Sequence, residues 1–293
     1  MPRGTALTQR GRLRVRQLSK DDVREHVWSL LTAERVARFP GARGRIPNFV
    51  GAEAAARCLA ALPEWRAART IKCNPDSPQL PVRVQALRDG KRLFVAVPRL
   101  RDERCFLELD PRRLAGRERA AASIRGAARF GRPTPVDEMP PIDLIVAGSV
   151  AVGRDGARAG KGGGFSDLEF GLLRELGLVG PRTTITTTVH PLQIQRRKIP
   201  MLAHDIPLDV IVTPDDVIRC PRRHPRPRGI LWRALPEEKI AEIPVLASRR
   251  GRARAGPKLP QRGARGRGKA PAARATGRRR ATRRAGRRAA ASP

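Results

Sequence analysis

The chain has 293 residues, of which 40% are hydrophobic and 3% aromatic, and it contains no tyrosine. Its formal net charge is +34, and it has no apolar run near the roughly 18 residues that cross a bilayer, so we expect no contact with a membrane. The basic first residues lack the apolar stretch of a secretory signal. Its four cysteines are scattered, as is typical of free thiols in a reducing compartment. We therefore expect a cytoplasmic protein.

The positive charge is concentrated at the two ends of the chain. Residues 248–293 carry 17 Lys or Arg and no acid, and residues 1–20 carry six and no acid. A net charge of +11 remains for the residues between them, so the folded part should itself attract anions. We expect residues 1–18 and 248–293 to be disordered, and residues 19–247 to form one domain.

The first expected helix begins after Ser19, a suitable N-cap. Apolar residues follow at helical spacing, namely Val23, Val27, Leu30 and Leu31. Lys20 and Arg24 lie in line with this apolar stripe, one helical turn apart. The pair either borders a cleft at the rim of the core or is an ordinary solvated pair.

Helical and β-branched segments alternate through the rest of the domain. We expect a helix over 51–62, strands over 70–73, 142–147, 183–190, 208–213 and 230–232, and a hairpin of 82–87 and 93–97 around Asp89-Gly90. This alternation predicts an α/β fold with an open, mixed or mostly parallel sheet flanked by helices.

The stretch 153–167 is the strongest local signal. It follows the expected strand 142–147, and four of its residues 160–164 are glycines. A helical apolar pattern comes next, with Asp167 as the expected N-cap and Gly177 as the stop. The predicted order is therefore strand, glycine loop, helix.

This glycine loop has the chemistry of a phosphate cradle. Glycine lacks the Cβ that keeps backbone N–H groups away from an anion, and a helix start adds partial positive charge. Arg158 and Lys161 add mobile countercharge. The alternative is a flexible surface loop, and the spacing is that of neither a Walker A loop nor a Rossmann fingerprint.

Residues 248–293 are rich in Arg, Ala, Gly and Pro, with Leu259 as the single large aliphatic residue. Such a segment cannot bury enough apolar surface to fold alone. It favours phosphate backbones through counterion release and does not read bases. Non-specific nucleic acid is therefore a candidate partner, and the alternative is an extension without a partner.

The pattern Arg158-x-Gly160-x-Gly162-x-Gly164-Phe165-x-Asp167 resembles the nucleotide and folate loop of 5-formyltetrahydrofolate cyclo-ligases, also called methenyltetrahydrofolate synthetases. Other stretches match the family in order: Lys20 to Arg24 resembles its Lys-x-x-x-Arg, and 199–213 resembles its C-terminal segment. Residues 44–51 and 73–83 resemble a divergent branch, the methenyltetrahydrofolate synthetase domain-containing proteins.

The resemblance implies ATP-driven closure of 5-formyltetrahydrofolate to 5,10-methenyltetrahydrofolate. By this resemblance, ATP is bound by Lys20, Arg24, Arg158, Gly160, Lys161, Gly162, Gly163, Gly164 and Asp167, with Arg158 and Lys161 in catalysis. The folate contacts are Gly162, Gly163, Gly164 and Phe165, and the Mg²⁺ ligands are Asp167 and Asp205. The alternative for these aspartates is structural, as an N-cap and a turn residue.

Three departures from the family pattern bear on activity. The family's loop lysine falls at Gly163, and its tyrosine pair falls at Phe165-Ser166. The glutamate that the family uses for the pterin falls within 79–82, where there is no carboxylate. A lost charged hydrogen bond of about 1.5–3 kcal/mol would weaken folate binding. The second reading is therefore a catalytically weak relative that binds a nucleotide or RNA.

Overall fold

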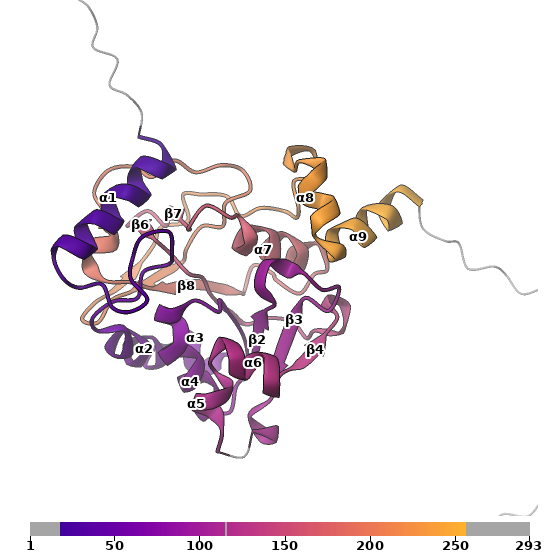
Figure 1. Cartoon of the computed structure of the whole chain (residues 1–293), viewed down its shortest axis with the longest axis horizontal. Coiled ribbons are helices and arrows are strands. Elements are labelled where there is room, and N and C mark those ends of the chain that lie inside the picture. Colours follow the sequence, from indigo (N-terminus) through magenta and orange to yellow (C-terminus); the bar gives the residue numbers. More distant parts are fainter. Residues whose placement is uncertain (1–17, 115, 256–293) are drawn as a thin grey trace, which may run out of the picture. The chain divides into compact units, whose positions relative to one another are not determined.

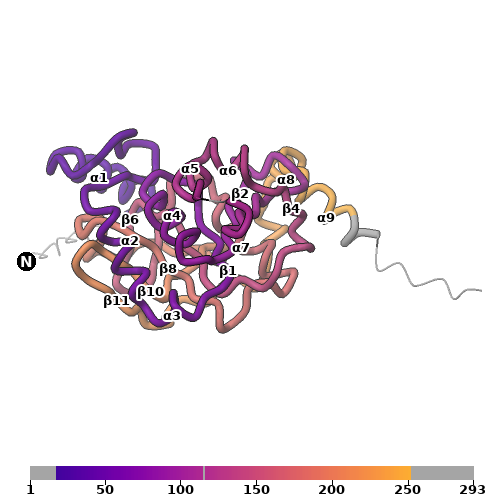
Figure 2. Tube along the Cα trace, turned by 90° about the horizontal axis from the view of Figure 1, so that it is seen from below, coloured from indigo at the N-terminus to yellow at the C-terminus, as the bar shows by residue number. Residues whose placement is uncertain are grey.

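A computed structural model describes residues 18–114 and 116–255. An eight-stranded sheet forms its centre, with spatial order β11 (Val217–Arg219), β10 (Val210–Val212), β8 (Thr184–Thr188), β5 (Leu144–Val146), β1 (Thr70–Cys73), β2 (Arg92–Ala96), β3 (Phe106–Leu109) and β4 (Arg132–Thr134). In Figure 2 the labelled strands β11, β10, β8, β1, β2 and β4 follow one another in this order. The five strands from β10 to β2 pair in parallel, whereas β11, β3 and β4 pair antiparallel. The predicted mostly parallel α/β sheet is confirmed.

Helices cover both faces of this sheet, as Figure 1 shows. One face carries α2 (Ala52–Ala60), α3 (Pro63–Ala67), α4 (Leu80–Arg88), α5 (Glu118–Ala121) and α6 (Ile124–Phe130). The other face carries α7 (Phe165–Glu175), α8 (Glu237–Glu242) and α9 (Pro244–Ala255). None of the helices in the described ranges is both long and apolar enough to cross a membrane.

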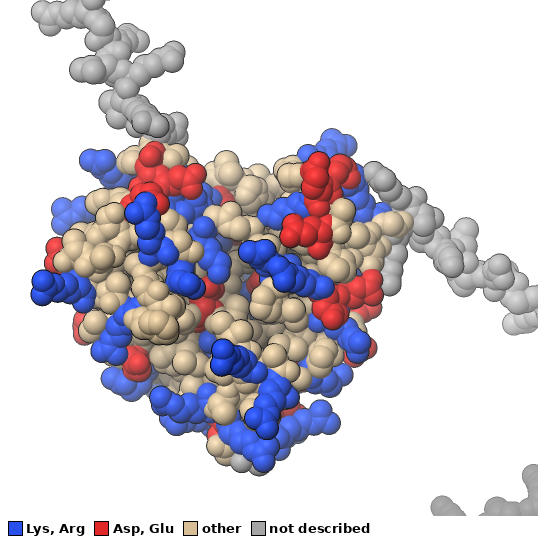
Figure 3. Space-filling view, viewed as in Figure 1, with Lys and Arg blue, Asp and Glu red and all other residues tan. Residues whose placement is uncertain are grey.

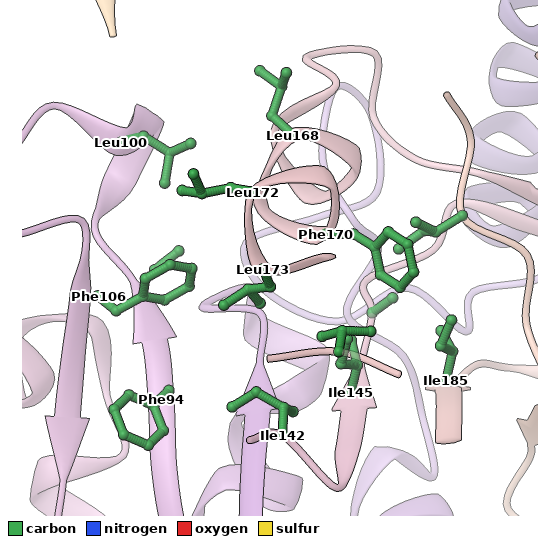
Figure 4. Close-up of a cluster of buried hydrophobic side chains, with 14 of the residues drawn as sticks. Phe94, Leu100, Phe106, Ile142, Ile145, Leu168, Phe170, Leu172, Leu173 and Ile185 are labelled. Atoms are coloured by element: carbon green, nitrogen blue, oxygen red, sulfur yellow. The ribbon is translucent and has the colours of Figure 1, made fainter. Parts of the chain in front are cut away.

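The sheet has one hydrophobic core on each face, because successive side chains of a strand point to opposite faces. In β5, Leu144 and Val146 belong to the core under α2 and α4, whereas Ile145 belongs to the core under α7. Figure 4 shows this second core, in which α7 places Phe170 and Leu173 over the strands. Burial on both faces explains why β5 and β10 are apolar without alternation.

A second, three-stranded sheet carries the predicted glycine loop. Its strands are β7 (Arg158–Ala159), β6 (Ala151–Gly153) and β9 (Ile194–Gln195), in that order. The helix α1 (Lys20–Ala33) packs on it through Val23, Val27 and Leu31. Ser19 caps α1 through a capping box with Asp22, so the expected helix start is confirmed.

The expected hairpin of 82–87 and 93–97 is wrong. Residues 80–88 form α4, and β2 pairs in parallel with β1 and antiparallel with β3, so 82–87 is not its partner. Apolar side chains one turn apart, such as Val82 and Ala86, are buried against α2 and the sheet. The Asp89-Gly90 turn therefore ends a helix, with Gly90 at φ +72°.

Two other expectations change at the C-terminal side. The expected strand over 230–232 is absent from the described residues, where 232–234 form a 3₁₀ turn. The helix α9 continues to Ala255, beyond the expected domain end at 247. Residues 1–17 and 256–293, on which most of the disorder prediction falls, lie outside the described residues.

Glu108 of β3 is a buried carboxylate near the edge of the sheet. It is 7% exposed and lies between Arg92 of β2 and Arg132 of β4. Burial raises the pKa of the Glu108 carboxyl, but the two arginines outweigh this effect and hold the pKa below its ordinary value. This contribution to stability is therefore complete above the unfolded-state pKa and is lost as the pH falls through the folded-state pKa.

Glu108→Gln should lower the free energy of unfolding by about 1.5 kcal/mol at neutral pH, because charged hydrogen bonds are weakened. The difference from the unmodified protein should shrink as the pH falls from 7 toward 3. Urea unfolding at several pH values measures it. A difference that does not depend on pH would show that packing, rather than charge, accounts for the effect.

Candidate functional site

A cleft of about 550 Å³ opens at the carboxyl ends of the parallel strands. The segments after β1, β2 and β5 line it with the glycine loop, and they include 74–77, 96–99, Gly148 and 163–167. Ligands of open α/β sheets bind at this edge, because the loops that leave neighbouring strands meet there. The cleft is therefore the candidate site.

The glycine loop precedes a helix, as predicted, but it follows β7 rather than the expected strand 142–147, because β6 and β7 lie between that strand and the loop. Gly162 has φ +108° and Gly164 has φ +69°, a region that favours glycine. Gly164 is the N-cap of α7, so the expected N-cap Asp167 lies inside the first turn. Gly160, Lys161, Gly163, Gly164, Phe165 and Asp167 line the cleft.

Arg158 is a fixed cation in the wall of the cleft, not the mobile one expected. Its side chain is 2% exposed, and its Nη2 donates to Oδ1 of Asp167 at 2.6 Å. Its Nη1 donates to the carbonyl of Gly148 at 3.0 Å. Its buried Nε has no hydrogen-bond partner among the described residues. A phosphate oxygen would satisfy that donor.

The helix α1 brings its two predicted cations to the loop. Arg24 donates from Nε to the carbonyl of Gly160 at 2.6 Å, and its Nη1 contacts Asp21 at 2.5 Å. Lys20 forms an ion pair with Asp205. Arg24 thus contacts the glycine loop and Lys20 contacts Asp205, whereas neither residue lines the cleft.

The segment that contains Asp205 reaches Asp167 through its backbone. The backbone N–H of Ile206, next to Asp205, donates to Oδ1 of Asp167 at 3.1 Å. Oδ2 of Asp167 has no partner within 18–114 and 116–255, so it could bind Mg²⁺ together with phosphate oxygens. Asp205 is less suited, because its Oδ2 already accepts from Lys20 and from the Leu202 N–H.

Sequence reasoning missed a carboxylate in the cleft. Asp76 lies three residues after β1 and pairs with Lys161, its Oδ1 lying 3.0 Å from the Lys161 Nζ. No carboxylate was expected for the pterin, yet Asp76 offers one only three residues before 79–82. Its place just past the strand 70–73, at the carboxyl edge of the sheet, was the signal that could have found it.

A buried polar group beneath the loop was also missed. Lys72 of β1 and Glu169 of α7 form an ion pair, with side chains 2% and 5% exposed. Burial raises the pKa of the Glu169 carboxyl, and the charge of Lys72 opposes this shift. A lysine inside the apolar strand 70–73 and a glutamate within the apolar stripe of α7 were the available signals, because buried charges need partners.

Lys239 of α8 also contacts the glycine loop. Its Nζ donates to the carbonyl of Gly163 at 2.8 Å and lies 5.3 Å from the centre of the Phe165 ring. Buried Ile240 and Ile243 hold this part of the chain against the core. A cation therefore reaches Gly163, the position at which the family has its loop lysine. It comes from α8, and no local sequence pattern connected that helix to the loop.

The architecture is that of an α/β protein with a cleft at the carboxyl edge of a mostly parallel sheet, the usual position of a ligand site in this class. Residues 16–214 match the model of the 5-formyltetrahydrofolate cyclo-ligase family. The chain belongs to that family, as the resemblance of its motifs predicted.

Its curated relatives include methenyltetrahydrofolate synthase domain-containing proteins. The chain is 38% identical to that of Bos taurus over 237 residues, which are 80% of this chain and 62% of the relative. It is 35% identical to that of Homo sapiens over 239 residues, with 80% and 62% covered. The chain thus spans less than two thirds of these relatives' length.

A solved structure is also similar, the NMR structure of Aquifex aeolicus 5,10-methenyltetrahydrofolate synthetase. It aligns with 71% of this chain and 94% of its own, at 22% identity and a TM-score of 0.45.

Proposed function

We propose that this protein closes 5-formyltetrahydrofolate to 5,10-methenyltetrahydrofolate at the expense of ATP. The observation that supports the proposal is the cleft itself, where a glycine loop, the buried Arg158 and the Asp76 carboxylate meet in a member of the cyclo-ligase family. The first two suit phosphate oxygens, and the third suits the N–H groups of a pterin.

The phosphates of ATP belong at the glycine loop. The start of α7 supplies partial positive charge there, and Arg158 adds a buried cation to the wall of the cleft. Lys161 is 48% exposed and is held by Asp76, so it can turn from that carboxylate to a phosphate. Lys20 and Arg24 add positive charge from α1. Figure 3 shows Lys and Arg over much of the visible face, which favours anionic ligands.

The folate occupies the part of the cleft next to Asp76. A pterin presents an amino group and a ring N–H on one edge, and a carboxylate accepts both. Asp76 is 15% exposed at its side chain, so most of its hydration is already removed. This carboxylate supplies the charged acceptor that the sequence comparison found missing. Phe165 of the loop lines the same cleft and offers an apolar surface to the substrate.

The reaction needs positioned charge more than a protein nucleophile. The formyl oxygen attacks the γ-phosphorus, and ADP leaves. N10 then attacks the activated formyl carbon, the C–O bond breaks, and phosphate carries the oxygen away. Arg158 and Lys161 stabilise the negative charge on the transferring group, and N10 loses its proton. Mg²⁺, held by Asp167 with the phosphates, would neutralise further phosphate charge.

A direct assay tests the proposal. The ultraviolet absorbance of methenyltetrahydrofolate should rise when the protein is mixed with 5-formyltetrahydrofolate, ATP and Mg²⁺. It should stay flat when any of the three is withheld. Binding of ATP without any product would reject the cyclo-ligase function and favour a catalytically weak relative.

The alternative of an RNA-binding protein gains no support. It depends on the basic tail, most of which lies outside the described residues. Removing residues 256–293 should leave turnover unchanged if the cleft carries the function.

A further inference from the structure

We propose that Ser166 donates a hydrogen bond to a carbonyl oxygen of the substrate, and that buried Lys72 and Asn74 set the direction of this donor. The inference rests on the proposed function, since it assigns a contact within the same cleft. It concerns a position where the family has tyrosine and this chain has a much shorter hydroxyl.

The first step is the orientation of the Asn74 amide. Lys72 Nζ lies 3.0 Å from Oδ1 of Asn74, and the Lys72 side chain is 2% exposed. An ammonium group has donors and no acceptor. The atom of Asn74 that faces Lys72 must therefore be its carbonyl oxygen, which leaves the NH₂ group on the other side.

The second step is the state of the Ser166 hydroxyl. Nδ2 of Asn74 lies 2.6 Å from Oγ of Ser166. Because Asn74 is the donor in this bond, Ser166 Oγ is the acceptor and keeps its own hydrogen. No acceptor for that hydrogen is present within the described ranges. Ser166 and Asn74 both line the cleft, so the hydrogen is available to a ligand there.

Glu169 is the ion-pair partner of Lys72. It is buried on α7, one turn after Ser166, and pairs with Lys72. Removing charge from water is costly, so the ion pair persists only while both partners hold their places. The pair with Glu169 thus holds Lys72 beside Asn74, which favours the amide orientation in which Asn74 donates to Ser166.

A carbonyl oxygen is the ligand group that fits this donor. Asp76 follows Asn74 by two residues and accepts hydrogen bonds, whereas Ser166 gives one. A pterin carries a carbonyl beside its ring N–H, and the substrate adds a formyl oxygen. Arg158 and Lys161 are the cations assigned to the phosphates. The Ser166 hydroxyl is a single neutral donor, and it suits a neutral oxygen. The acceptor of the Ser166 hydrogen bond is therefore either the ring carbonyl oxygen or the formyl oxygen of the substrate.

Ser166→Ala should weaken the binding of 5-formyltetrahydrofolate about 3- to 10-fold, the value of one neutral hydrogen bond, with ATP affinity unchanged. Ser166→Thr keeps the hydroxyl and should restore folate binding. Calorimetric titration of both ligands measures this. Equal loss of ATP and folate affinity would overturn the inference, because it would indicate a damaged loop.

Asn74→Asp tests the direction of the donor. An aspartate offers only acceptors, so it would accept from Lys72 and also capture the Ser166 hydrogen. Asn74→Asp should therefore reproduce the loss seen in Ser166→Ala, and the double variant should bind no more weakly than either single one. Additive losses in the double variant would overturn the proposed link between the two residues.

The product distinguishes the two oxygens, because 5,10-methenyltetrahydrofolate keeps the ring carbonyl and lacks the formyl oxygen. If Ser166→Ala weakens product binding as well, the contact is with the ring. If only the substrate is affected, the contact is with the formyl group. Unchanged folate binding in Ser166→Ala overturns this inference alone, whereas an unmodified protein that binds neither folate overturns the proposed function too.

Discussion

Arg158→Met is expected to lower the free energy of unfolding by about 3 kcal/mol and to weaken ATP binding about 10- to 100-fold. The stability loss arises because Asp167, 12% exposed, is left without its cation, and an unpaired buried charge is costly. The loss of affinity follows from removing a charged contact with a phosphate. For a body of this size, the melting temperature should fall by roughly 6–12 °C.

The double variant Arg158→Met/Asp167→Asn separates the two effects. The introduced asparagine carries no charge, and its carbonyl oxygen can still accept from the Ile206 N–H. Stability should therefore recover while ATP binding stays weak. Thermal unfolding and calorimetric titration provide the two readouts. ATP affinity that returns together with stability would contradict a direct contact between Arg158 and a phosphate.

Gly164→Val is expected to abolish measurable ATP binding at a moderate cost in stability. Its φ of +69° is unfavourable for a β-branched residue, and a left-handed residue costs about 1–2 kcal/mol. The space beside it is open, since the nearest atom to an added Cβ is Lys239 Nζ at 3.6 Å. The loop is thus expected to shift to relieve backbone strain, and the phosphate cradle is lost with it.

Gly177→Val is the matched control. Gly177 lies just past the other end of α7, at φ +70°, and an added Cβ would meet no atom within 4 Å. The backbone strain is therefore the same, but the site lies away from the cleft lining. Both variants should lose similar stability in urea unfolding, and only Gly164→Val should lose ATP. Equal loss of ATP binding in both would argue against a cradle at the loop.

Local sequence patterns correctly predicted the elements whose signals are contained within one turn or one strand. The N-cap at Ser19, the apolar stripe of α1 and the strand 70–73 are of this kind. The segment 80–88 misled because its residues Val82 to Gln85 alternate between apolar and polar, as in a half-buried strand. Its parallel neighbours β1 and β2 need a crossover, which is a property of the whole sheet.

The sequence by itself determined the glycine loop, its place before a helix, and the cations that accompany it. Only the tertiary structure decided that Arg158 is buried, that Asp76 enters the cleft and that Lys239 reaches Gly163. These contacts join residues far apart in the chain, such as Lys161 and Asp76 at a separation of 85. Periodicity reports the burial of one element at a time, whereas a hydrogen-bond partner is chosen by the packing of several elements against one sheet edge.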